Sequence, residues 1–225
     1  MPRRLWFCPA GMPVHVVQRG NNRQVCFAKE ADMAAYANWL GEYAKKFDVE
    51  VHGWVFMTNH VHLLLTPKDE TGVSKLMQTL GRLYVRYFND GYQRTGTLFE
   101  GRYKSSVVQQ EEYFLNCLRD IERNPVRAGM VNDPGDYKWS SYRAHAFGVK
   151  AKMWSPHALY SDLGMSDIAR QSHYRKWMSE AMATEVLGKI RACLEKGLVL
   201  GTDRFREQVS GLVIPPLLIE VKSSA

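Results

Sequence analysis

Apolar positions between residues 14 and 123 follow two different periods, and segments of each kind alternate along the chain. Short runs rich in β-branched residues predict strands at 14–19 (VHVVQR), 49–57 (VEVHGWVFM) and 60–66 (HVHLLLT). Apolar residues three and four apart predict helices over 29–47, 71–89 and 111–123, and the last ends before Pro125. The two residues between the second and third strands predict a hairpin.

A further strand, over 97–108, completes the order β-α-β-β-α-β followed by a helix. This order is that of the ferredoxin-like split βαβ arrangement, so we predict an α+β fold with an antiparallel sheet packed by helices. Beyond Pro134 the sequence predicts short helices separated by Gly and Pro. We expect a ferredoxin-like domain over 1–135 and a helical extension over 136–225, with 214–225 as a loosely held tail.

Composition narrows the class of protein. The chain has 225 residues, of which 45% are hydrophobic, and this excludes a disordered protein. It has no apolar run of about 18 residues, which excludes a membrane span, and its first residues do not form a secretory signal. The four cysteines form no CxxC pair, which suits a reducing compartment, so we expect a cytoplasmic protein.

The sharpest chemical feature is His60-Val61-His62 in the third strand. Residues two apart on a strand point to the same face, so the two imidazoles are suited to hold one divalent metal ion. Val61, Leu63 and Leu65 then point to the opposite face and should pack under the helices. The alternative is a pair of half-buried, hydrogen-bonded histidines without a metal.

Tyr113, near the start of helix 111–123, is the second feature. Beside a metal ion, a tyrosine can attack a phosphodiester and form a covalent phosphotyrosine. Taken alone, a helical tyrosine is far more often part of the core or its rim. Tyr113 shares a helix face with Cys117, four residues later.

The net charge of +7 permits nucleic-acid binding but does not require it. Five of these seven charges lie within residues 1–150, and basic and aromatic residues are interleaved between Lys75 and Lys104. This stretch lies in the chain between the histidine strand and the tyrosine helix, and we expect it to form a track for DNA phosphates.

Five motifs occur in one order at compatible spacings: HVVQRGNNRQVCF, NHVHLLL, GTLFEGRYKSS, EEYFLNCLRDIERNPVRAG and YKWSSYRAH. Together they resemble the transposases that use one tyrosine and a His-hydrophobe-His (HUH) metal motif. The closer resemblance is to the REP-associated tyrosine transposases of bacteria, and it covers roughly residues 5–147.

The resemblance implies that 1–135 is an HUH nuclease domain acting on single-stranded DNA near palindromic hairpins. The residues matching His60 and His62 bind Mg²⁺ or Mn²⁺, and the one matching Tyr113 forms a 5′-phosphotyrosine and frees a 3′-OH that can rejoin strands. No nucleotide cofactor is needed. The implied protein is bacterial and nucleoid-associated, has no membrane partner, and is a monomer or a homodimer.

One departure from the family pattern concerns the metal. In related insertion-sequence transposases, a polar residue four positions after the tyrosine completes the metal site, whereas here that position is Cys117. A thiol suits a hard cation such as Mg²⁺ poorly. The third ligand is therefore open between water, Asn116, Glu112 and a softer metal on Cys117.

Candidate DNA contacts are polar and basic residues on the loop after the first strand, in the basic stretch and on the tyrosine helix. They are Arg19, Asn21, Asn22, Arg23, Arg82, Arg86, Arg94, Arg102, Lys104, Arg119 and Arg123.

The predicted function is thus a metal-dependent single-stranded DNA endonuclease and strand transferase. One alternative is a protein derived from a transposase that binds hairpin DNA or RNA without cutting it. Another is a metal-dependent phosphodiesterase whose nucleophile is water.

Overall fold

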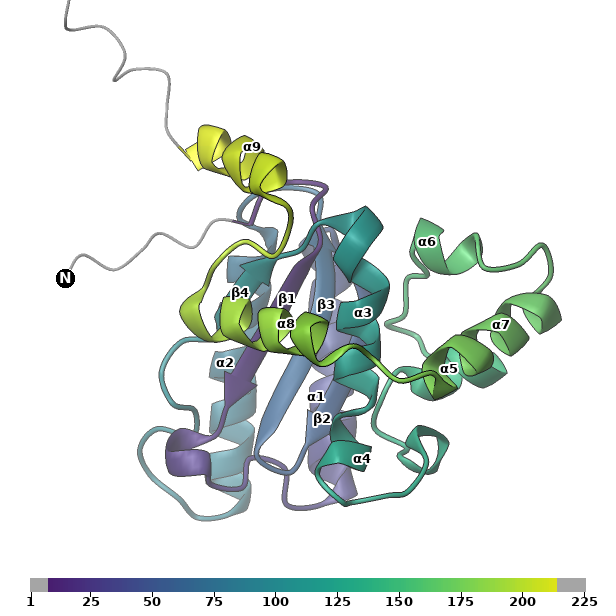
Figure 1. Cartoon of the computed structure of the whole chain (residues 1–225). Coiled ribbons are helices and arrows are strands. Elements are labelled where there is room, and N and C mark those ends of the chain that lie inside the picture. The colour runs from purple at the N-terminus through teal and green to yellow at the C-terminus, as the bar shows by residue number, and fades with distance from the viewer. Residues whose placement is uncertain (1–7, 214–225) are drawn as a thin grey trace, which may run out of the picture.

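The computed structural model describes residues 8–213 and is built around one four-stranded sheet (Figure 1). The strands are β1 (Val14–Arg19), β2 (Val49–Met57), β3 (His60–Pro67) and β4 (Lys104–Val107). Their order is β2-β3-β1-β4, and each neighbouring pair is antiparallel. With α1 (Glu30–Lys46) and α2 (Gly72–Gly91) between the strands, this confirms the predicted ferredoxin-like α+β arrangement. The tail predicted over 214–225 lies outside the described residues.

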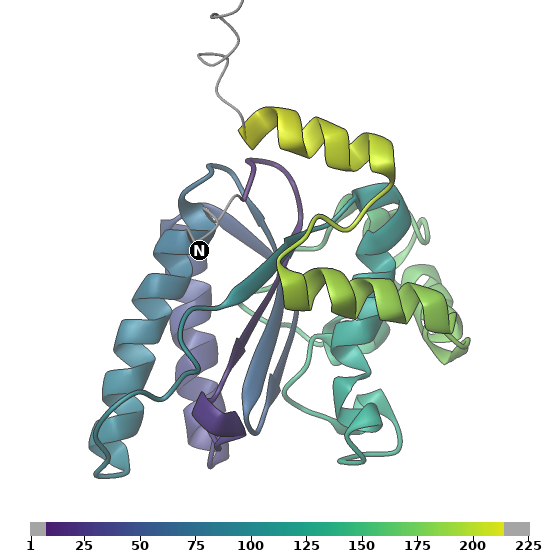
Figure 2. The ribbon, with the colours of Figure 1, turned by 60° about the vertical axis from the view of Figure 1, so that its left-hand side comes forward.

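Helices cover both faces of the sheet (Figure 2). On one face α1 and α2 pack on Val14, Val16 and the side chains of Val61, Leu63 and Leu65, as predicted from the alternation in β3. On the other face lie α3 (Gln110–Glu122) and α8 (Thr184–Lys196). The residues of β2 and β3 that point this way join a second core with both helices. The histidine pair lies on this second face.

The strand predicted over 97–108 is shorter than expected. Only Lys104–Val107 forms a continuous ladder with β1, because Gly101 adopts a φ of 87°, which an extended strand does not allow. Before it, Phe99 forms only an isolated bridge with Gly20. The segment before β4 is consequently a loop. The predicted phosphate track is also wrong in its placement, since α2 and α3 lie on opposite faces of the sheet and most of the basic stretch is therefore not between the histidines and Tyr113.

The predicted helical extension consists of short helices, as expected. They are α4 (Asn124–Arg127), α5 (Tyr142–Phe147), α6 (Ala158–Ser161), α7 (Asp167–Ser179), α8 and α9 (Asp203–Val213), with 3₁₀ turns η1 (Asn21–Arg23) and η2 (Pro134–Asp136). Where the first domain ends stays a prediction, but residues beyond 135 contact both edges of the sheet, through bridges of Val55 with Ser140 and Val108 with Leu200. Within 8–213, no helix is long and apolar enough to cross a membrane.

Candidate histidine centre

His60 and His62 lie at the start of β3, at the end of the sheet where the β2–β3 hairpin turns. His60 is paired with Arg19 on β1 and Met57 on β2, and His62 is two pairs further into the sheet. The two ring centroids are 5.0 Å apart, and the ring planes are nearly perpendicular at 80°. The expectation that both imidazoles share one face of the strand is met.

Both rings are held by hydrogen bonds at Nδ1. His62 Nδ1 is 2.9 Å from Nε2 of His15, a diagonal neighbour on β1, and His60 Nδ1 is 2.6 Å from Oδ1 of Asn59. The Asn124 side chain forms a further hydrogen bond to His60. Metal-binding histidines are usually oriented in this way by a partner on the second ring nitrogen.

Burial keeps these imidazoles neutral. It lowers the pKa of His15 to about 3 and, with the positive charge of Arg19, that of His60 to about 4. The pKa of His62 is lowered well below its ordinary value by burial and by the neighbouring histidines and arginines. A metal ion binds only neutral imidazole, so at neutral pH the pair is in the required protonation state.

The pair nevertheless lacks a third protein ligand. Within residues 8–213 no three side chains among His, Cys, Asp and Glu are grouped to hold a metal ion. Cys117 is fully buried in the core, and burial raises its pKa well above the ordinary value, so it is a neutral thiol. Asn116 bonds back to the Glu112 carbonyl within α3. Two imidazoles fit a divalent ion only if water or a bound phosphate supplies the other positions.

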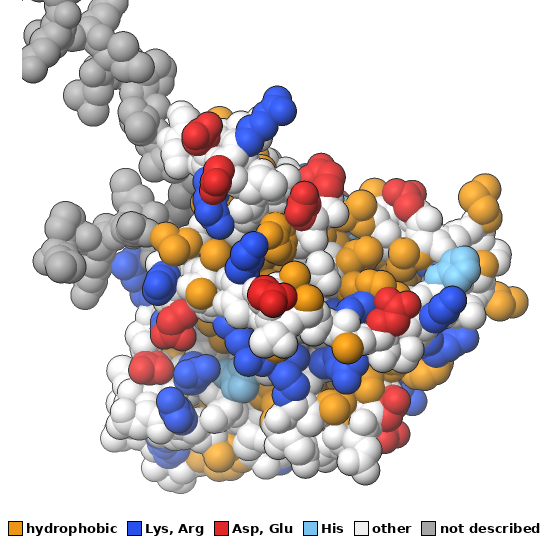
Figure 3. Space-filling view, in the orientation of Figure 1, with side chains coloured by type: hydrophobic (Ala, Val, Ile, Leu, Met, Phe, Trp, Pro, Cys, Tyr) orange, Lys and Arg blue, Asp and Glu red, His pale blue; other side chains and the backbone are white. Residues whose placement is uncertain are grey.

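Positive charge surrounds the histidines. Arg19 lies beside them on β1, and Arg127 on α4 is close enough to lower the pKa of His62. Arg127 also forms a 2.9 Å ion pair with buried Asp120, whose other basic neighbour is Arg191 of α8 at 4.0 Å. Figure 3 shows Lys and Arg side chains gathered on this face below α8, with a histidine among them. The surface is therefore suited to an anion such as a DNA phosphate.

A family model described as "Transposase IS200 like" matches residues 9–123, more than half of the chain. The chain belongs to the IS200-like transposase family. No curated protein matches it.

Among solved structures, a REP-associated tyrosine transposase bound to a REP hairpin is similar, with a TM-score of 0.52 and 17% identity. The similarity covers 70% of this chain and 92% of that one, and at this identity it shows the fold alone. A putative transposase from Deinococcus radiodurans R1 has a TM-score of 0.36 and 16% identity, over 58% of this chain and 90% of that one.

In this member of the transposase family, Tyr113 is not next to the histidines. Tyr113 lies in the first turn of α3, which follows β4. Val107 at the end of β4 pairs with Val14, and Val14 pairs in turn with Leu65. Leu65 is five residues from His60 along β3, about 16 Å. Figure 1 shows the same separation, with the start of α3 at one end of the molecule and the β2–β3 turn at the other. The expected contact between Tyr113 and the histidines is absent from this conformation.

The part of α3 nearest the histidines carries Asp120, and Asn124 follows at the start of α4. Asn124 contacts His60, so it occupies the place expected for the polar residue of the family pattern. The residue four positions before Asn124, where that pattern has the tyrosine, is Asp120. Asp120 lies about 10 Å further along the helix axis than Tyr113. Asp120 is therefore nearer than Tyr113 to the histidine end of the sheet.

The predicted DNA contacts fall into three groups. The first group lies on the histidine side of the sheet and consists of Arg19, Lys104 and the 3₁₀ turn Asn21–Arg23. Lys104 forms an ion pair with Glu195 at 2.7 Å, and the Arg23 carbonyl accepts a hydrogen bond from Asn59. A second group, on the opposite side of the sheet, comprises Arg82, Arg86 and Arg102. The last group, Arg94, Arg119 and Arg123, is engaged within the protein.

Arg119 in particular is unsuited to DNA. It is 4% exposed, its guanidinium lies 3.6 Å from the Trp177 ring centroid, and it donates to the Trp177 carbonyl. Arg123 donates to the Met178 carbonyl, and Arg94 donates to Gln24. Arg119 and Arg123 therefore bind α7 to α3, and Arg94 binds the loop that contains Gln24.

Four residues of the centre were missed from the sequence: His15, Asn124, Arg127 and Arg191. His15 had a signal, because it stands in a predicted strand and alternation gives it one of two faces. Asn124 and Arg127 belong to the motif NPVRAG, but only the fold brings them to His60 and His62. Arg191 lies in the helical extension and carries no signal in the sequence.

Proposed function

We propose that this chain binds hairpin-containing single-stranded DNA at the His60–His62 centre, with a divalent metal ion, and that it forms no covalent link through Tyr113. The fold neighbour solved with a REP hairpin makes hairpin DNA the first ligand to test. The observation that supports the proposal is that Asn124 of α4 contacts His60, whereas Tyr113 lies in the first turn of α3, at the other end of the sheet.

His60 and His62 would hold the metal ion through imidazole nitrogen. Imidazole favours Mn²⁺ over Mg²⁺, which prefers oxygen ligands. When bound, the ion would polarise a phosphate oxygen of the DNA. The chain's own contribution is to keep both imidazoles neutral and oriented, through His15 and Asn59, and to neutralise the phosphate with Arg19 and Arg127.

The test measures binding of a fluorescent hairpin oligonucleotide with Mn²⁺ and with EDTA. We expect Mn²⁺ to tighten binding, and the pair of substitutions His60→Ala and His62→Ala to abolish that effect, a loss of about tenfold or more. His173→Ala, at an exposed histidine of α7, serves as the control and should behave as the unmodified protein. A protein that does not bind the hairpin at all contradicts the proposal.

A second candidate function is strand cleavage with Tyr113 as nucleophile, as the resemblance implies. Its specific support is the neutral, oriented histidine pair, which would hold the metal ion that such chemistry needs. It requires the start of α3 to approach the histidines. An adduct between protein and DNA that survives SDS, appears with Mn²⁺ and is lost in Tyr113→Phe would establish this candidate in place of the first.

A further inference from the structure

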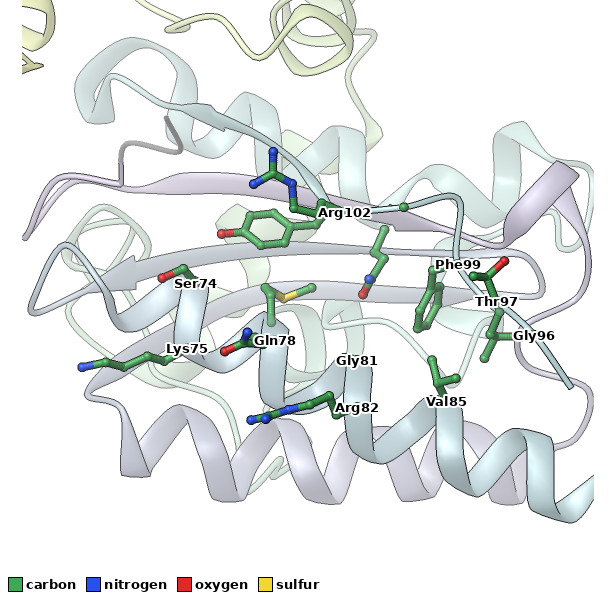
Figure 4. Close-up of a pocket in the computed structure, with 15 residues that line it drawn as sticks. Ser74, Lys75, Gln78, Gly81, Arg82, Val85, Gly96, Thr97, Phe99 and Arg102 are labelled. Atoms are coloured by element: carbon green, nitrogen blue, oxygen red, sulfur yellow. The ribbon is translucent and has the colours of Figure 1, made fainter. Parts of the chain in front are cut away.

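A second candidate site lies on the face of the sheet away from the histidines. A cavity of about 650 Å³ opens between α2 and the loop 96–103 that precedes β4. Figure 4 shows Ser74, Lys75, Gln78 and Arg82 along one wall and Thr97, Phe99 and Arg102 on the other. Its lining includes neither His60 nor His62, so it is separate from the centre described above.

A buried hydrogen-bond acceptor lies in this cavity. Gln18 points from β1 to the same face as Val14 and Val16 and is only 7% exposed. Within the described chain, its side-chain oxygen Oε1 is buried and has no hydrogen-bond partner. Leaving such an oxygen unsatisfied costs about 1–3 kcal/mol, which a ligand that donates a hydrogen bond would recover.

The surroundings of Gln18 combine aromatic rings with positive charge. Phe99 lines the cavity as a largely buried ring, and Lys75, Arg82 and Arg102 are the charged residues of the lining. Among the described residues that line the cavity there is no Asp or Glu. Stacking rings, cations for phosphate and an acceptor for base N–H groups are the elements by which proteins bind unpaired nucleotides.

We propose that this cavity binds an unpaired nucleotide of single-stranded DNA, with the base near Gln18 and Phe99 and its phosphate near Arg82. The volume lies in the range of small-molecule sites and accommodates one nucleotide. The inference rests on the proposed DNA binding, but it uses other residues and needs no metal. DNA would then contact both faces of the sheet, with the paired hairpin and an unpaired segment held separately.

Gly81 offers a way to fill the cavity without disturbing the fold. It lies inside α2, lines the cavity, and a Cβ built there meets no atom within 4 Å. Leucine at this position has a higher helix propensity than glycine. Gly188 on α8 is a matched control, because it is also a helical glycine with open space around its Cβ but lies outside the cavity.

The experiment measures binding of a short, non-palindromic single-stranded DNA in EDTA by fluorescence anisotropy. We expect Gly81→Leu to weaken binding about tenfold or more, as loss of one stacked base would, and Gly188→Leu to have little effect. Arg82→Glu should weaken binding, whereas Arg86→Glu, one turn further at an exposed arginine paired with Asp90, should do so far less. Gln18→Leu should weaken binding and change the preference among bases.

Equal binding by Gly81→Leu and Gly188→Leu would overturn the inference, as would equal effects of Arg82→Glu and Arg86→Glu. The two proposals fail separately. If His60→Ala with His62→Ala abolishes oligonucleotide binding in EDTA, the cavity is not the site. If the oligonucleotide binds but the hairpin gains nothing from Mn²⁺, only the function proposed for the histidine centre fails.

Discussion

At the scale of single residues, we expect Asp120 and Asn124 to determine what the histidine centre can do. Asn124 reaches His60, and Asp120 one turn earlier is buried in an ion pair with Arg127. A carboxylate beside a DNA phosphate repels it, so Arg127 and Arg191 must offset that charge before DNA can bind. A phenol at the same position would add no such charge and could act as a nucleophile.

We therefore expect Asp120→Tyr to gain an activity. With hairpin DNA and Mn²⁺ it should form an adduct that survives SDS electrophoresis, and the adduct should persist when Tyr113→Phe is added. The new tyrosine lies one turn before Asn124, whereas Tyr113 lies at the far end of α3. An adduct in the unmodified protein that depends on Tyr113 would contradict this expectation.

At the scale of elements, periodicity predicted the strands of the β2–β3 hairpin and all three long helices of residues 14–123 within a few residues. It failed over 97–103, where Gly101, with a positive φ, turns a run resembling a strand into a loop. It could not tell which face of the sheet each helix covers, so the basic residues of α2 were assigned to the wrong face. For the same reason the sequence could not tell at which end of the sheet Tyr113 lies, because the end at which α3 starts depends on strand pairing.

The packing of α3 against the extension depends on one buried carboxylate. Glu122 is fully buried and accepts hydrogen bonds from Ser141 Oγ at 2.5 Å and Tyr174 OH at 2.6 Å, and it lies 2.7 Å from His145 Nδ1. These partners come from α5, α7 and the residue before α5. The carboxylate thus joins α3 to two helices of the extension.

We expect Glu122→Gln to lower the free energy of unfolding by about 2–4 kcal/mol, because an amide cannot accept all three bonds and its NH₂ faces donors. Urea denaturation followed by circular dichroism would measure this. Glu111→Gln, at an exposed glutamate in the first turn of the same helix, is the control and should change stability by less than about 0.5 kcal/mol. Equal effects of the two substitutions would show that the network contributes little.

At the scale of the whole molecule, buried neutral histidines connect stability to pH. His52 is 2% exposed and bonds to the Ser155 carbonyl at 2.8 Å and to Thr66 Oγ1 at 2.9 Å. Burial lowers its pKa to about 4, with smaller effects of nearby His157 and His145. Glu50, 3.9 Å away, is half exposed and gives little compensation.

The folded protein therefore binds fewer protons than the unfolded chain between pH 6.5 and about 4. The stability contributed by neutral His52 should be complete above pH 6.5 and lost progressively as the pH falls towards 4. We expect the free energy of unfolding to fall less steeply with acidification in His52→Gln than in the unmodified protein. The control His173→Gln, at an exposed histidine, should retain the full slope.

The bridges at Ser140 and Leu200 have a consequence for how the molecule meets its own copies. An open sheet normally presents backbone N–H and C=O groups along its outer strands, which invite pairing with another chain. Here Phe56 N donates to the Trp139 carbonyl beside β2, and Leu200 N donates to the Val107 carbonyl beside β4. The extension thus occupies both borders of the sheet from within the same chain. At these positions two copies cannot join their sheets edge to edge, so the segment after residue 135 also disfavours aggregation through the sheet edges.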